Sequence, residues 1–144
     1  MKKIAILITL FGMSVNAFAL QCPPPSALQH RGLGQQWKLN TAYKNDFIVL
    51  DSQARWSRLK TMDGHLPLSV HLLSYPGKNW YATCSYNTAR NSNRRQVKLI
   101  SVHEVLLAKA STPLSPLFKP ASPVIQNIHV CTTVADEPAT CVWF

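Results

Sequence analysis

The sequence predicts a small, mainly β domain, or an α+β domain with one minor helix, built on an antiparallel sheet or sandwich and stapled by two disulfides. Two stretches, Leu66 to Tyr75 and Trp80 to Tyr86, alternate apolar and polar residues on either side of a turn-forming segment, which is the pattern of a β-hairpin. Four cysteines, an even number, indicate a disulfide framework. Without an N-terminal leader, residues 20–144 have the length of one domain with its own core.

Residues 1–19 have the features of a cleaved secretory signal peptide. Lys2 and Lys3 give a positive start, Ile4 to Val15 is a short apolar run, and residues 17–19 place alanine at both positions read by signal peptidase. The run is about a dozen residues, and a membrane-spanning helix needs roughly 20, so no membrane span is expected. We expect export by a Sec-type signal to the periplasm or exterior of a Gram-negative bacterium.

The first part of the domain is predicted to be extended, with one helix. Cys22 to Ser26 contains three consecutive prolines and predicts a polyproline-type arm. Gln36 to Asn40 and Phe47 to Leu50 have strand patterns. Ser52 to Met62 is the best helix candidate, with Ser52 as its N-cap and a glycine soon after its end.

Strands are also predicted after the hairpin. Gln96 to His103 is compatible with a third strand, although its continuation, Glu104 to Ala110, is compatible with a helix. Thr112 to Pro123 contains four prolines and is expected to cross the domain without regular structure. Val124 to Val134 and Thr140 to Phe144 are predicted to close the chain as a second hairpin.

The four cysteines, Cys22, Cys84, Cys131 and Cys141, can pair in three ways. We favour Cys131 with Cys141, because residues 135–138 are typical of a turn that would place these two opposite each other. Cys22 would then pair with Cys84. Neither a C-x-x-C motif nor a histidine pair at ligand spacing occurs, so no metal site is expected.

The charge of the chain suggests anionic partners. Without the leader, thirteen Lys and Arg face six Asp and Glu, a net charge of about +7. Such a surface attracts anionic glycan, lipopolysaccharide, or a host or envelope protein, and the alternative is a solvated surface that only confers solubility. Nucleic acid is not expected, because no RRM, KH or helix-turn-helix pattern is present.

Aromatic side chains near these charges are candidates for stacking on sugars or anchoring a protein, with ordinary packing as the alternative. Trp56 lies between two arginines, and Trp80 begins a predicted strand next to Tyr81, so the two adjacent rings face opposite ways. The candidate binding residues are Arg55, Trp56, Arg58, Trp80, Arg90, Arg94, Arg95 and Lys98.

No catalytic residue and no cofactor are predicted. A ribonuclease-like site would need two histidines and a lysine around a phosphate, and His71, His103 and Lys98 are the best triple that the predicted strands offer. A G-x-S-x-G nucleophile elbow is absent. A secreted hydrolase or nuclease is therefore an alternative and not the main hypothesis.

Several short motifs resemble a family of small exported proteobacterial proteins with no assigned activity. The likeness is carried by Cys-Pro-x-Pro-Ser at Cys22, by Trp37 and Phe47, and by Cys-Ser-Tyr at Cys84 ahead of a Val97-x-Leu99 strand. It covers about residues 20–100. The resemblance implies the bridge from Cys22 to Cys84 and an exported location, and it implies nothing about catalysis.

The function expected from the sequence is that of a secreted or periplasmic, non-enzymatic binding protein. Its target would be an anionic envelope or host component, bound by a basic surface that also carries aromatic residues. Besides a hydrolase or nuclease, the remaining alternative is an inhibitor of a lytic enzyme or protease, in which an exposed loop blocks the foreign active site.

Overall fold

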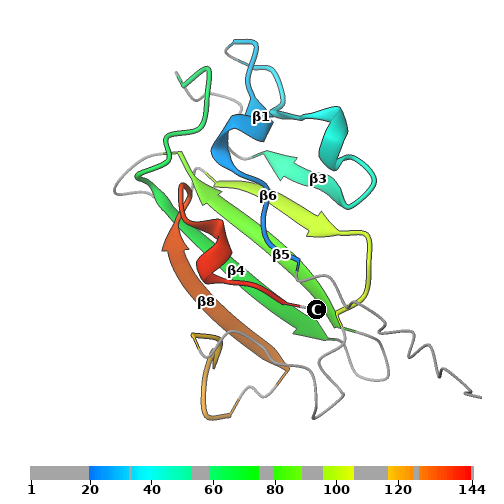
Figure 1. Ribbon diagram of the computed structural model, residues 1–144, viewed down its shortest axis with the longest axis vertical. Helices are drawn as coiled ribbons and strands as arrows, with labels where there is room; N and C mark the ends of the chain where they lie inside the picture. The colour runs from blue at the N-terminus through cyan, green and yellow to red at the C-terminus, as the bar shows by residue number, and fades with distance from the viewer. Residues whose placement is uncertain are drawn as a thin grey trace, which may run out of the picture.

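Two antiparallel sheets make up the fold in the computed structural model, which describes residues 20–32, 34–52, 59–74, 80–88, 96–105, 117–124 and 127–143. The smaller sheet pairs β1 (Leu28–Gln29) with β2 (Lys38–Leu39). The larger has six strands in the order β3-β6-β5-β4-β8-β7 (Figure 1). Its strands are β3 (Phe47–Ser52), β4 (Pro67–Ser74), β5 (Trp80–Asn87), β6 (Gln96–Ser101), β7 (Lys119–Pro120) and β8 (Ile128–Val134).

The described ranges contain no α-helix. They contain three short 3-10 turns, η1 (Pro25–Ala27), η2 (Thr41–Tyr43) and η3 (Pro138–Thr140). The prediction of a mainly β, antiparallel fold stapled by two disulfides is confirmed. Within the same ranges, no helix is both long and apolar enough to cross a lipid bilayer.

The predicted central hairpin is the middle of the large sheet. β4 and β5 pair antiparallel from Leu68 opposite Tyr86 to Ser74 opposite Trp80. Along β4, Leu68 and Val70 are fully buried while Ser69 between them is partly exposed, as the alternating pattern of the sequence requires. β6 pairs with β5 on one side, and β8 pairs with β4 on the other.

One face of the large sheet, which we call the core face, carries the hydrophobic core. Both ends of the described chain cover this face: the arm that begins at Leu20 and the segment that ends at Trp143 pair with each other, with hydrogen bonds in both directions between Leu20 and Trp143. Figure 1 shows the blue N-terminal arm and the red C-terminal segment crossing the same side of the sheet. Trp143 is fully buried and meets the ring of Phe47 edge to face at 6.3 Å.

The two disulfides, Cys22–Cys84 and Cys131–Cys141, fasten these covering segments to the core face. The pairing favoured from the sequence is therefore confirmed. Beside the first bridge, the buried hydroxyl of Tyr86 donates a hydrogen bond to the carbonyl oxygen of Pro23 at 2.6 Å. This bond satisfies a backbone acceptor of the proline-rich arm.

Two expected elements differ in the structure. Residues after Cys141 do not pair with β8 as a hairpin, because η3 turns the chain across the core face and Trp143 bridges Leu20 instead. A helix was expected from Ser52 to Met62, but neither end of this segment is helical. Ser52 is the last residue of β3, and Thr61 forms a β-bridge with Gln29. Residues 53–58 between them lie outside the described residues.

Candidate functional site

The large sheet has a second face, opposite the core face, whose residues follow from the alternation of side chains along each strand. Residues opposite each other in neighbouring strands point to the same face, so the register assigns this second face across all six strands. Its members are Ile48, Asp51, Pro67, Ser69, His71, Leu73, Tyr81, Thr83, Ser85, Asn87, Gln96, Lys98, Ile100, Lys119, Ile128, Val130, Thr132 and Val134.

A hollow of about 540 Å³ opens on the second face, a volume in the usual range for small-ligand sites. Four strands contribute to it, β3, β4, β5 and β6. Its lining residues are Leu50, Ser69, His71, Leu73, Thr83, Ser85, Gln96 and Lys98. They supply an ammonium group, an imidazole, three hydroxyls and an amide. The register also places Asp51 of β3 opposite Lys98.

A polar row crosses this hollow. Ser69 on β4 lies opposite Ser85 on β5, and Ser85 lies opposite Lys98 on β6. Ser85 is buried, and neither its hydroxyl nor that of Ser69 forms a hydrogen bond with any other part of the chain that the structure describes. Exposed Lys98 likewise forms no ion pair with any side chain that the structure describes. The row therefore presents donors that the described residues leave unused.

The imidazole of His71 stands beside this row, opposite Thr83. Burial lowers the pKa of His71 below the ordinary 6.5, and the positive charge of Lys98 lowers it further. His71 is thus neutral at neutral pH. An anion placed between the two would offset the repulsion of Lys98 and favour the protonated ring, so His71 responds to the charge of whatever the hollow contains.

Of the candidate binding residues, Lys98 lines the hollow, and Trp80 does not. Trp80 shares the core face with Ala82 and Cys84, and its ring meets that of His129 edge to face at 5.4 Å. Lys98 and Trp80 thus lie on opposite faces of the sheet. The remaining candidates, Arg55, Trp56, Arg58, Arg90, Arg94 and Arg95, lie outside the described residues.

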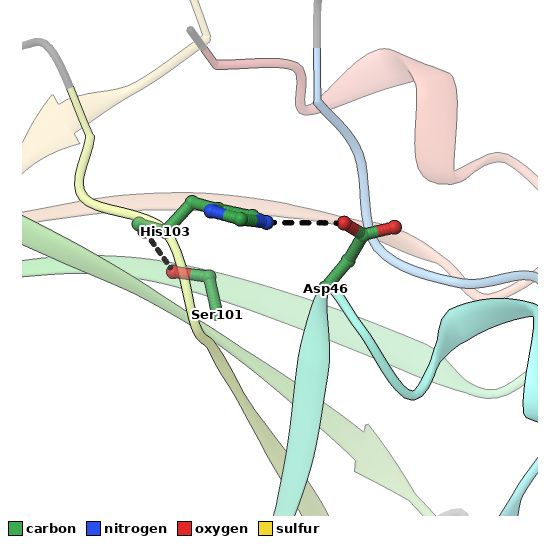
Figure 2. Close-up of polar contacts among 3 residues, drawn as sticks. All are labelled: Asp46, Ser101 and His103. Atoms are coloured by element: carbon green, nitrogen blue, oxygen red, sulfur yellow. Dashed lines mark hydrogen bonds and ion pairs between the residues drawn. The ribbon is translucent and has the colours of Figure 1, made fainter.

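The histidine triple weighed for a nuclease is only partly assembled. His71 and Lys98 share the hollow, but His103 is not among its lining residues. Instead, exposed His103 contacts Asp46, the residue before β3, with 3.2 Å between the imidazole Nε2 and a carboxylate oxygen (Figure 2). The backbone oxygen of His103 also accepts a hydrogen bond from the hydroxyl of Ser101 at 2.9 Å. His103 therefore belongs to the corner between β3 and β6.

Several residues of the site were not found from the sequence. Ser69, Thr83 and Ser85 are ordinary polar positions of predicted strands. The alternation of the hairpin was enough to place Ser69 and Ser85 on the face opposite the core. It could not show that Lys98 lies opposite Ser85, because the register between β5 and β6 depends on the fold.

The donors in the hollow suit an anionic group, since ammonium and hydroxyl groups bind phosphate, sulfate and carboxylate oxygens. Among the described residues, no group of three or more His, Cys, Asp or Glu is arranged to hold a metal ion. Comparisons with protein-family models, curated proteins and solved structures found no match for this chain.

Proposed function

We propose that this protein is an exported binding protein that captures an anionic group of an envelope or host component on the second face of its large sheet. The carrying observation is that Lys98, His71 and the hydroxyls of Ser69 and Ser85 line one hollow on this face. The ligand chemistry is that of a sulfate, phosphate or carboxylate group on a glycan or lipid headgroup.

Charge and compartment support this proposal. Two disulfides are typical of an oxidising, extracytoplasmic environment, where anionic glycans and lipid headgroups are abundant. The net charge of about +7 without the leader raises the local concentration of anions and the rate of encounter.

Binding is favoured over hydrolysis by the composition of the hollow. Acid-base cleavage of a phosphodiester needs two groups that can exchange protons, and His71 is the only imidazole among the lining residues.

The proposal is tested by measuring affinity with the exported, oxidised protein and three probes. A sulfated heparin oligosaccharide, a uronate oligosaccharide and lipopolysaccharide separate sulfate, carboxylate and phosphate as the bound group. Lys98→Gln should weaken binding of the preferred probe about tenfold, because it removes a charged hydrogen-bond donor. Lys60→Gln is the matched control, since Lys60 is also exposed and lies outside the hollow. Equal losses in both variants, or no binding of any probe, would reject the second face as the site.

A further inference from the structure

A second concave surface lies at the edge of the large sheet, away from the hollow. It is a groove of about 460 Å³ between the segment that contains β2 and the outer side of β3. Its lining residues are Trp37, Lys38, Leu39, Lys44, Phe47, Ile48 and Val49. None of them lines the hollow on the second face, so the two surfaces are independent.

β3 is an edge strand, and its outward backbone groups face this groove. The amide of Val102 donates to the carbonyl oxygen of Asp46 at 2.8 Å, and Ile48 lies opposite Ile100 two residues further along. Hydrogen-bonded pairs alternate along an antiparallel ladder, so Ile48 also directs its N–H and C=O toward β6.

Phe47 and Val49, on either side of Ile48, therefore direct their backbone N–H and C=O groups away from β6. No hydrogen bond from another described residue reaches these outward groups. They form an open template for one more strand.

Exposed apolar side chains beside this edge also indicate that the groove is a binding surface. Ile48 and Leu50 each expose 54% of their surface next to this edge. An added strand supplies backbone partners for the outward groups of Phe47 and Val49, and its side chains would cover Ile48.

The positive charge of the groove favours an acidic partner. Lys38 and Lys44 are its charged residues, and both are exposed. The nearby carboxylate of Asp46 is held by His103, as Figure 2 shows, and does not line the groove. Two copies of this chain would bring like charges together at this edge, with a net charge of about +7 on each. An acidic segment meets no such repulsion.

We infer that the edge of β3 binds an extended, acidic segment of a partner protein, which adds to the sheet as a further strand beside β3. Backbone hydrogen bonds at Phe47 and Val49 give affinity, and the two lysines give the preference for acidic side chains. The bulge at Leu50, where the register with β6 shifts, ends the regular part of the edge. The paired stretch of β3 is therefore short, from Phe47 to Val49.

The test uses two capped peptides, one of alternating valine and glutamate and one of alternating valine and lysine, with affinity measured by calorimetry. The valine-glutamate peptide should bind, and the double variant Lys38→Glu/Lys44→Glu should lose at least about tenfold in affinity for it at low ionic strength. The same variant should gain affinity for the valine-lysine peptide. The matched control, Lys60→Glu/Lys119→Glu, has the same net charge and should keep the original preference.

A second variant tests the backbone contacts. Val49→Pro removes an outward N–H without removing a bond to β6, so the sheet should remain intact while peptide binding is lost. Val49→Thr retains the N–H and should bind as the parent does. Binding that survives in folded Val49→Pro, or equal losses in both lysine double variants, would overturn the inference. A concentration-dependent dimer that Val49→Pro abolishes would also overturn it, because the edge would then belong to a second copy.

Discussion

Cys84 and Cys131 lie on either side of Val70 in one cross-strand row of the large sheet. Their partners, Cys22 and Cys141, belong to the N-terminal arm and the C-terminal segment, so both covering segments are attached to the same row. The core face is thus closed by covalent bonds at its centre. The second face, which the row leaves on the other side, contains the hollow proposed to bind anions.

Removing each disulfide by paired Cys→Ala substitution should reveal their unequal contributions. The bridges close loops with sequence separations of 62 and 10 residues, and on the chain-entropy model they contribute about 4 and about 3 kcal/mol. Denaturant unfolding should therefore show a larger decrease in the free energy of unfolding for Cys22→Ala/Cys84→Ala than for Cys131→Ala/Cys141→Ala. A larger loss for Cys131→Ala/Cys141→Ala would mean that packing of the C-terminal segment, rather than loop length, decides the order.

Tyr86→Phe should destabilise the protein by about 1–3 kcal/mol, because it leaves the buried carbonyl of Pro23 without its donor. The control is Tyr81→Phe, at a partly exposed position of the same strand, which should change stability by no more than about 0.5 kcal/mol. Equal effects of the two substitutions on the free energy of unfolding would contradict the anchoring role of Tyr86.

Leu72 and Leu73 are adjacent in β4 and distinguish its two faces. Leu72 is fully buried on the core face, whereas Leu73 is partly exposed and lines the hollow. Leu72→Ala should therefore cost about 2–5 kcal/mol, as expected for a cavity in the core, and Leu73→Ala should cost clearly less. Since a register shift of one residue would exchange the two faces, the opposite order would contradict the observed register.

The pKa of His71 should be measurable by NMR titration, with a midpoint below 6.5. Lys98→Gln should raise that pKa, because it removes the repelling charge, and a bound anion should raise it in the parent protein. If neither Lys98→Gln nor a bound anion changed the pKa of His71, the electrostatic interaction between His71 and Lys98 in the hollow would be contradicted.

The same shift predicts how stability depends on pH. The folded chain binds the His71 proton more weakly than the unfolded chain does, so stability is complete above the unfolded pKa of 6.5 and falls as the pH decreases below it. His71→Asn should reduce the part of this acid destabilisation that begins near pH 6.5. Thermal unfolding from neutral to acidic pH measures this dependence. If the pH dependence of stability were the same in His71→Asn, the loss of stability in acid would come from other titrating groups.

Much of the sheet was predictable because its signals are local. The alternation on either side of the turn-forming sequence at residues 75–79 predicts the hairpin of β4 and β5, and the apolar run from Phe47 to Leu50 predicts β3. The turn between Cys131 and Cys141 was enough to favour their bridge. It did not predict that the chain after Cys141 would turn away from β8.

What was not predictable depends on contacts between segments far apart in the chain. β8 pairs with β4 some sixty residues away, and Leu20 pairs with Trp143, and no local pattern encodes either register. The hollow also depends on such contacts. Ser69 on β4 and Lys98 on β6 lie on the same face because both are in register with Ser85 on β5 between them. For that reason Lys98 could be selected from the sequence as a cation, but its position on the face opposite Trp80 could not be predicted.

The most direct test of the proposed binding face is an NMR titration of the ¹⁵N-labelled, oxidised protein with the probe that binds most tightly among the three anions. The account predicts that amide shifts change at Ser69, Ser85 and Lys98 on the second face, and that the Lys98→Gln variant loses these changes. Changes confined to the covering segments of the core face, or to residues 89–95 with none at Ser85 and Lys98, would contradict it.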